Sequence, residues 1–141
     1  MKFEATVGEV MRRKLKQASP EDSIQSAAKI MKERKVGSVL ITKDGKLKGI
    51  LTSMDIVNKY VADGKGETCG DIMSDEVVTI SPDKTIEEAA RLMTERGIEK
   101  LPVLENGRIT GIITNNDILR IEPTLFEILL EKLKIRDNLE E

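Results

Sequence analysis

The sequence predicts a mixed fold of the α/β (α+β) class, built from two related β-α-β-β-α units. A shift of 62 residues aligns 8–57 with 70–119 without a gap, and 16 of the 50 aligned positions are identical. Each copy also alternates β-branched runs with amphipathic helical patterns. Two copies of this length are too few and too long for a solenoid, so we expect a pseudo-two-fold pair that buries a shared face.

A Ser-Pro pair marks the first strand and helix of each unit. In the second copy the β-branched run 77–80 stops at Ser81-Pro82, because proline cannot continue a ladder of hydrogen bonds. A capping box at 85–88 then starts a helix. Its apolar face has helical spacing and consists of Ile86, Ala89, Ala90 and Met93, matched in the first copy by Ile24, Ala27, Ala28 and Met31. We expect strand and helix to make a right-handed crossover onto the next strand.

A β-hairpin follows the helix in both units. The paired runs are 39–42 with 46–51 around Asp44-Gly45, and 101–104 with 108–113 around Asn106-Gly107. These dipeptides favour a type I′ turn, because both of its central residues need positive φ. Gly49 and Gly111 fall inside the second strands, where glycine indicates a bulge or the close approach of another backbone.

A final helix is predicted just after each hairpin. Thr52 with Asp55, and Thr114 with Asp117, have the spacing of a helix N-terminus. The resulting boundaries are 6–58 for the first unit, 59–69 for a flexible linker, 70–121 for the second unit and 122–141 for a C-terminal helix and tail. The C-terminal helix has an apolar face too broad to leave in water, so it either packs on the domain or joins two chains.

Composition excludes several classes of function. The 141 residues are 39% hydrophobic, 34% charged and 2% aromatic, with no histidine and one cysteine, Cys69. A Ser-His-Asp or Cys-His nucleophile cannot form, and one thiol cannot hold zinc, so we expect no catalytic and no metal-binding residues. The net charge of −2 and the scarcity of aromatic side chains argue against nucleic-acid binding.

The same counts bear on where the protein works. No apolar run approaches the ~20 residues that a membrane-spanning helix needs. The first residues lack the apolar stretch of a secretory signal, and a single cysteine cannot form an internal disulfide. We therefore expect a cytoplasmic protein with no membrane segment.

The ordered set of motifs resembles the cystathionine-β-synthase-type domain, called CBS. The resemblance is carried by Gly-Ile-Leu-Thr-x-x-Asp-Ile at 49–56, Gly-Ile-Ile-Thr-x-x-Asp-Ile at 111–118, Val-Met at 10–11, Ile-Met at 72–73, both Ser-Pro pairs and Leu-Pro-Val at 101–103. It covers about 8–57 and 70–120, so the chain resembles a tandem CBS pair, or Bateman module.

This resemblance implies two related clefts between paired units that bind adenine-containing molecules, such as AMP, ADP, ATP, S-adenosylmethionine or NAD. It assigns the Asp117 and Asp55 carboxylates to ribose hydroxyls and places Thr114 and Thr52 near ribose or phosphate. A carboxylate can accept two hydrogen bonds from a vicinal diol, which suits this role. The same four residues also fit a purely structural helix cap, and the two roles are compatible.

The resemblance also implies a base and phosphate wall in the second unit. Lys100 would face the phosphates, whereas its local position favours a solvated lysine at a strand edge. Pro102 would stand beside the adenine. The remaining implied contacts are Val78, Thr79, Ile80 and Leu101, which composition alone describes as core strand. With so few aromatic residues, an adenine would have to be held between aliphatic side chains and by backbone hydrogen bonds.

The first unit departs from this pattern. Its equivalents of Lys100 and Leu101 are Ser38 and Val39, and Leu40 replaces Pro102. The missing charge predicts that the second unit suits a phosphorylated ligand better than the first. A basic cluster at 12–16 is interpreted as a solvated face, or else as a phosphate or partner contact.

The leading hypothesis is a non-catalytic regulatory module that binds an adenine nucleotide or adenosyl ligand, needs no cofactor, forms a homodimer and acts on a separate protein. One alternative is a dimerisation or scaffold protein with vestigial clefts. Another is a nucleic-acid-associated role through residues 12–16. A third is metal-dependent nucleotide hydrolysis by Asp117 or Asp55, against which the absence of a Walker-type loop argues.

Overall fold

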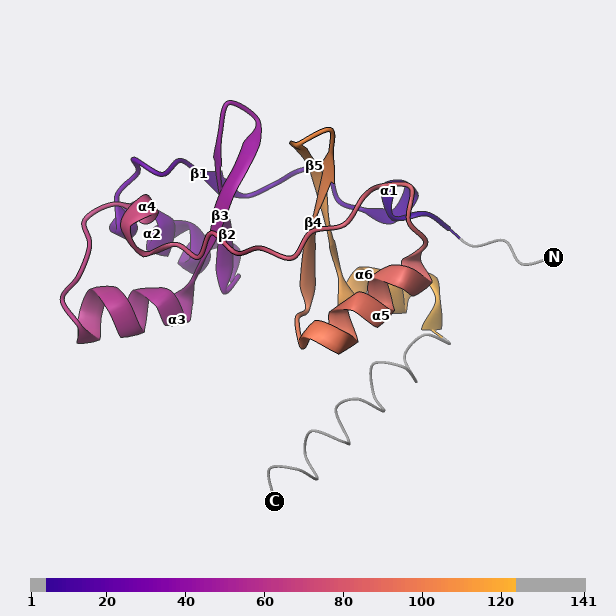
Figure 1. Ribbon diagram of the computed structural model, residues 1–141. Helices are drawn as coiled ribbons and strands as arrows, with labels where there is room; N and C mark the ends of the chain where they lie inside the picture. Colours follow the sequence, from indigo (N-terminus) through magenta and orange to yellow (C-terminus); the bar gives the residue numbers. More distant parts are fainter. Residues whose placement is uncertain (1–4, 124–141) are drawn as a thin grey trace, which may run out of the picture. The chain divides into compact units, whose positions relative to one another are not determined.

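The computed structural model describes residues 5–123, which divide into two compact units (Figure 1). The α2 unit, named after its longest helix, comprises residues 14–77 and 107–109. The α5 unit comprises 5–13, 78–106 and 110–123. Each unit therefore joins the body of one sequence repeat to a short segment from the start of the other repeat.

The α2 unit contains three paired strands. Its elements in chain order are β1 (Gln17–Ala18), α2 (Ile24–Arg34), β2 (Ser38–Lys43), β3 (Lys46–Thr52), α3 (Ser53–Asp55), the π-helix η1 (Ile56–Ala62) and α4 (Cys69–Ile72). β1 runs parallel to β2, and β2 runs antiparallel to β3, so α2 forms the crossover between the two parallel strands. This is the strand order that the sequence predicts.

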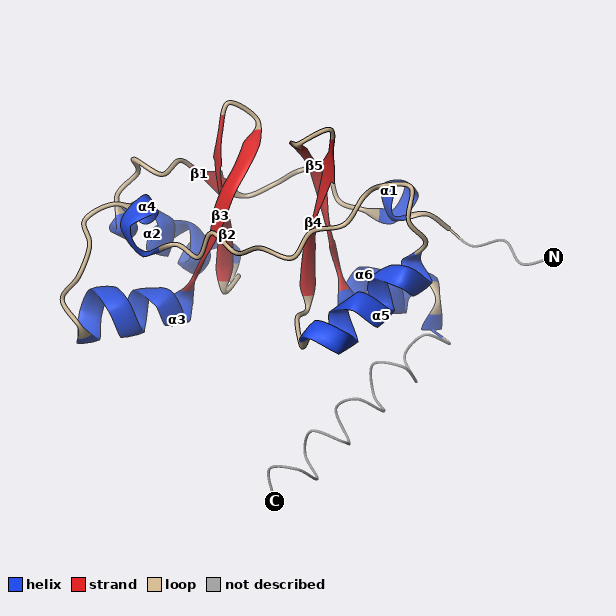
Figure 2. Ribbon diagram, viewed as in Figure 1, coloured by secondary structure: helices blue, strands red, loops and turns tan. Residues whose placement is uncertain are grey.

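The α5 unit repeats this plan. Its elements are α1 (Val7–Val10), α5 (Ile86–Arg96), β4 (Lys100–Glu105), β5 (Arg108–Thr114) and α6 (Asn115–Ile121). β4 and β5 are neighbouring strands, drawn as the second red hairpin in Figure 2. Both hairpin turns have positive φ at both central residues: 53° and 77° at Asp44-Gly45, and 53° and 79° at Asn106-Gly107. The predicted type I′ turns are confirmed.

The first strand of the α5 unit is shorter than the sequence predicts. Of residues 77–80, all of them described, Ile80 alone forms a bridge, parallel to β4. In the α2 unit the Leu40 N–H donates to the Lys16 carbonyl at 3.3 Å, and β1 spans two residues. The equivalent of Leu40 is Pro102, which has no N–H to extend the ladder.

One segment from the start of the first repeat packs on the α5 unit. The Val7 N–H donates to the Lys84 carbonyl at 2.8 Å, and the Gly8 N–H donates to the Pro82 carbonyl at 2.9 Å. A Cβ on Gly8 would lie 3.1 Å from the Pro82 Cβ. The Ser-Pro turn before α5 therefore binds α1, and glycine lets the two backbones approach.

The segment at the start of the second repeat makes the matching contacts on the α2 unit. The Cys69 N–H donates to the Asp22 carbonyl and the Gly70 N–H donates to the Pro20 carbonyl, each at 2.8 Å. Cys69 is fully buried, and this burial raises the pKa of its thiol. The thiol is part of the apolar core and is not poised to react.

We call these two segments, residues 5–13 on the α5 unit and 69–77 on the α2 unit, the exchanged segments. Each one continues as an antiparallel bridge to the last strand of the unit on which it packs. Arg12 and Ile112 exchange both backbone hydrogen bonds, at 2.8 and 3.0 Å. A Cβ on Gly111 would lie 2.9 Å from the Arg12 carbonyl oxygen, and one on Gly49 would lie 2.6 Å from that of Ser74. The predicted close approach of another backbone at both strand glycines is confirmed.

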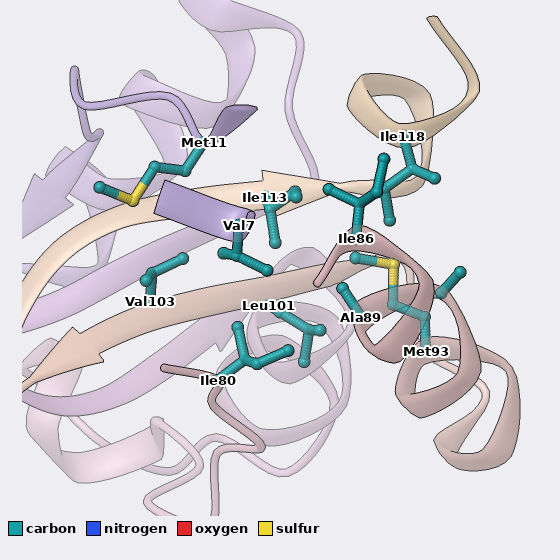
Figure 3. Close-up of a cluster of buried hydrophobic side chains, with 11 residues drawn as sticks. Val7, Met11, Ile80, Ile86, Ala89, Met93, Leu101, Val103, Ile113 and Ile118 are labelled. Atoms are coloured by element: carbon teal, nitrogen blue, oxygen red, sulfur yellow. The ribbon is translucent and has the colours of Figure 1, made fainter. Parts of the chain in front are cut away.

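Each unit has its own aliphatic core. The buried side chains of the α5 unit, most of them labelled in Figure 3, are Val7, Met11, Ile80, Ile86, Ala89, Ala90, Met93, Leu101, Val103, Ile113 and Ile118. Those of the α2 unit are Ala18, Ile24, Ala27, Met31, Val39, Ile41, Leu51, Cys69 and Ile72. The predicted apolar faces of α2 and α5 thus lie inward, and the exchanged segments supply part of both cores.

One predicted boundary differs in the structure, and one predicted helix lies outside the described residues. Helical structure continues to Ala62, four residues into the segment 59–69 predicted as linker. The predicted C-terminal helix falls on residues beyond 123 and lies outside the described residues. Within 5–123, no helix is long and apolar enough to cross a bilayer.

The glycine contact predicts a specific loss of stability. In Gly111→Ala the new methyl group would collide with the Arg12 carbonyl and the Met11 sulfur, so we expect the free energy of unfolding to fall by about 1–3 kcal/mol. Urea unfolding followed by far-ultraviolet circular dichroism measures it. Gly37→Ala is the matched control, because a Cβ there would meet nothing closer than the Ser53 hydroxyl at 3.8 Å. Equal losses in the two variants would contradict the proposed contact.

Candidate functional site

The residues predicted to bind ribose form capping boxes at helix starts. The Thr114 hydroxyl accepts from the Asp117 N–H at 3.2 Å, and the Asp117 carboxylate accepts from the Thr114 N–H at 3.0 Å. Thr52 and Asp55 make the same pair of bonds, both at 3.0 Å. The structural role expected from spacing alone is therefore present in both units.

A third capping box shows that this motif by itself does not define a ligand site. Thr68 and Asp71 have the same spacing and the same reciprocal bonds at the start of α4. The Asp71 carboxylate accepts from the Glu67 and Thr68 N–H groups, at 2.9 and 3.0 Å, and Asp71 is exposed. What separates Asp117 from Asp71 is its surroundings.

Asp117 is fully buried and enclosed by two arginines. Its Oδ1 accepts from Arg12 Nε at 2.9 Å and from an Arg120 guanidinium nitrogen at 2.7 Å. The Asp117 side chain is 0% exposed, whereas each arginine side chain is 58% exposed. Burial alone would raise the pKa of Asp117, but the hydrogen bonds from Arg12, Thr114 and Arg120 outweigh it and lower the pKa below its usual value. The carboxylate is therefore held ionised.

Asp55 has a more open environment. Its carboxylate lies 3.3 Å from the Lys59 ammonium nitrogen, and its side chain is 18% exposed. The same ammonium group donates to the Ile72 carbonyl at 3.0 Å. The residue equivalent to Arg12 is Ser74, which keeps the backbone bridge to β3 but carries no charge. The two carboxylates thus share a backbone setting and differ in their cations.

The predicted residues Lys100 and Leu101 lie at the same end of the α5 unit's hairpin. β4 begins at Lys100, next to the point where β5 ends at Thr114. The Asn115 N–H donates to the Glu99 carbonyl at 3.0 Å, which ties the start of α6 to the start of β4. The Ile80 N–H donates to the Pro102 carbonyl at 3.1 Å and pairs the first strand with β4.

Burial changes what some of these residues can offer a ligand. The side chains of Ile80 and Leu101 belong to the core and are 8% and 0% exposed (Figure 3). In this arrangement the two side chains offer almost no exposed surface for the sandwich of a base that the low aromatic content predicts. Val78 packs partly against the core, and Thr79 is half-buried. The backbone of 78–80 and the half-buried side chains of Val78 and Thr79 therefore remain available to a ligand.

In the α2 unit the structure also brings the predicted residues together. Ser38 is the register partner of Thr52, and Val39 is that of Leu51. The Ser53 N–H donates to the Gly37 carbonyl at 2.9 Å, so the start of β2 lies against the start of α3. The Val39 side chain is 1% exposed and belongs to the core.

A groove of about 390 Å³ opens on the α5 unit beside the first strand. It is lined by Thr79, Ile80, Ser81, Lys84, Glu88, Arg91, Leu92 and Glu95. It includes two of the predicted contacts and neither Thr114 nor Asp117. The predicted residues therefore divide between this groove and the hairpin end.

Sequence reasoning missed three cations that contact the carboxylates. Arg120 and Lys59 lie three and four residues after an aspartate on a helix, which is the spacing of ion pairs along one face. This spacing can be recognised in the sequence. Arg12 is 105 residues from its partner, so no local pattern could pair them. The ion pair gives the exposed Arg12 side chain an intramolecular partner that the interpretation of residues 12–16 did not include.

The Arg12 ion pair predicts a change in acid stability. Because the folded-state pKa of Asp117 is lowered, its ionisation stabilises the fold above about pH 4, and this contribution is lost as the pH falls through the folded pKa. Arg12→Ala moves that pKa up, so the midpoint of acid unfolding should shift to higher pH in circular dichroism. Arg13→Ala, the exposed neighbour, matches the charge change. An identical midpoint in both variants would refute the effect of the ion pair.

Comparisons with known proteins agree with this architecture. A family model described as CBS domain matches residues 7–62 and 69–123. An uncharacterized protein of Methanopyrus kandleri is 40% identical over 135 residues, which cover 92% of this chain and 68% of that protein.

Two solved structures also share the fold. A CBS domain pair in complex with 5′-methylthioadenosine and S-adenosyl-L-methionine has a TM-score of 0.74 and 31% identity, covering 86% of this chain and 98% of that one. A protein in complex with AMP has a TM-score of 0.75 and 26% identity, with the same coverage of 86% and 98%. With a family match on each repeat, this chain belongs to the CBS domain family as a tandem pair of CBS domains.

Proposed function

We propose that this protein is a non-catalytic regulatory module that binds adenine nucleotides or adenosyl ligands through the Asp117 and Asp55 carboxylates. The observation that carries the proposal is the repetition of one carboxylate in the same backbone setting in both units, after the hairpin and beside an exchanged segment. A related domain pair binds 5′-methylthioadenosine and S-adenosylmethionine, and another related protein binds AMP. In such a module the ligand acts by its different affinity for two arrangements of the chain or of an attached partner.

The base would be recognised by backbone groups. In the α2 unit the Lys16 carbonyl is used by the Leu40 N–H. In the α5 unit the equivalent carbonyl belongs to Val78, and Pro102 has no N–H to give it. That carbonyl suits an adenine amino group, which is a donor. The α5 unit therefore fits an adenine better than the α2 unit does.

A thermal-shift screen with AMP, ADP, ATP, S-adenosylmethionine and NAD tests the proposal. A ligand at 100 times its dissociation constant adds about 2.7 kcal/mol of stability, which is easily seen as a rise in Tm. An extrinsic dye is needed, because the chain has no tryptophan. No shift with any of the five ligands at millimolar concentration would reject the proposed function.

Substitution of the two aspartates tests whether their carboxylates bind the ligand. Asp117→Asn combined with Asp55→Asn removes both charged acceptors, and we expect ligand affinity to fall at least about tenfold. Asp71→Asn is the matched control, because it alters the same capping motif at α4 and leaves both predicted carboxylates in place. A control that lost affinity as strongly as the double variant would show that the effect is loss of folding.

The proposed regulatory unit is a homodimer, with exposed apolar side chains on the α2 unit supporting self-association. Met54, Val57 and Val61 lie within two helical turns along α3 and η1 and are 58%, 49% and 69% exposed. Apolar surface of this kind is typical of an interaction site. A second copy of the chain would cover it without requiring any charged complement.

Sedimentation equilibrium measures the assembly. We expect twice the monomer mass for the wild-type chain and dissociation towards the monomer in Val57→Glu combined with Val61→Glu, because two charges would be buried at the interface. Asn58→Glu adds a charge to the same helix at an exposed polar residue and serves as control. A monomeric wild-type chain would exclude the homodimer.

A further inference from the structure

The Asp117 carboxylate cannot receive a ribose without losing one of its present partners. A carboxylate offers about four lone-pair positions. Arg12, Arg120 and the Thr114 N–H already take three of them, at 2.9, 2.7 and 3.0 Å. A vicinal diol brings two donors, so one of the existing donors must leave. The fully buried state of Asp117 leads to the same conclusion, because the two arginine side chains cover it.

Arg12 is the partner whose departure disturbs the fold least. The Thr114 N–H belongs to the capping box, and Arg120 is a local partner one turn along α6. The backbone of Arg12 is fixed by both hydrogen bonds to Ile112, so its side chain can swing while its Cα stays in place. At the equivalent position the α2 unit keeps the same backbone bridge with Ser74. The fold therefore needs the bridge and does not need a guanidinium there.

The charge of the ligand decides whether this displacement is costly. A guanidinium that leaves a buried carboxylate loses a charge-assisted hydrogen bond, and a phosphate group restores one of similar strength. A nucleoside without phosphate restores nothing, so its affinity is reduced by the full loss. In the α2 unit Ser74 imposes no such competition, and the Asp55 side chain is already 18% exposed.

We propose that Arg12 is a specificity-determining residue that hinders the binding of uncharged nucleosides to Asp117. When a phosphorylated adenosyl ligand binds, the Arg12 side chain swings away from Asp117 and its guanidinium pairs with the phosphate of the ligand. The α2 unit, with Ser74 in its place, then accepts adenosyl ligands without a phosphate. This inference rests on the proposed function, because it assigns a ligand class to each of the same two carboxylates.

Titration calorimetry with AMP and adenosine as probes tests the inference. The parent chain carries Asp55→Asn, so that binding at Asp117 is measured alone. We expect AMP to bind at least about tenfold more tightly than adenosine, and Arg12→Ser to reduce this ratio about tenfold, mainly by strengthening adenosine binding. Arg12→Lys should restore part of the preference. Arg13→Ser, with the same change of charge, should leave the ratio unchanged.

A merely structural role for Arg12 would weaken both ligands equally and leave their ratio unchanged, which would overturn the inference. The reciprocal variant Ser74→Arg, in an Asp117→Asn parent, should weaken adenosine binding at Asp55 about tenfold and serves as an independent test. Unaltered adenosine binding in Ser74→Arg would also count against the inference.

The outcomes separate this inference from the proposed function. Binding of both probes at Asp117 with a ratio that ignores Arg12 overturns the inference and leaves the proposed function intact. Binding in the Asp117→Asn parent but not in the Asp55→Asn parent likewise overturns only the inference. Failure of the chain with both aspartates intact to bind either probe overturns the proposed function, and the inference falls with it.

Discussion

The backbone bridge between each exchanged segment and the last strand of its unit is the constraint on which the rest of the structure depends. Arg12 meets Ile112, and Ser74 meets Ile50, with both hydrogen bonds formed in each case. The bridge requires glycine on the strand and brings Met11 or Met73 against it. In the α5 unit it also places the Arg12 side chain against Asp117 at the start of α6. Core packing and site composition are therefore fixed by the same contact.

The three capping boxes show how one local motif acquires different chemistry from its surroundings. Asp71 caps a helix at the surface, Asp55 is partly covered and has a lysine partner, and Asp117 is buried beneath two arginines. In each case the carboxylate stabilises the first turn by satisfying N–H groups that the helix leaves open. The neighbouring side chains, some local along the helix and one brought by a tertiary contact, distinguish a simple cap from a candidate binding group.

Local patterns predicted most of the fold because they are local in origin. The hairpins followed from Asp-Gly and Asn-Gly, and the faces of α2 and α5 followed from helical spacing. The first strand of the α5 unit was predicted too long. Pro102 lacks an N–H, and this shortens the strand only because the strand pairs with β4, which contains Pro102. The Arg12–Asp117 ion pair spans 105 residues and depends on segment exchange, which no periodicity encodes. For the same reason, the sequence alone could not show whether the side chains of Ile80 and Leu101 lie in the core or line a base pocket.

The exchange of segments also affects the order in which the two units can fold during synthesis. Residues 5–13 leave the ribosome before their partners at 82–86 and 112, which are synthesised about seventy to a hundred residues later. The body of the α2 unit and its own exchanged helix, α4, are complete by residue 77. During synthesis the α2 unit can close while the first segment still waits, and that segment must remain available until the last hairpin emerges. A chain that stops before this hairpin leaves Val7 and Met11 without the core that buries them.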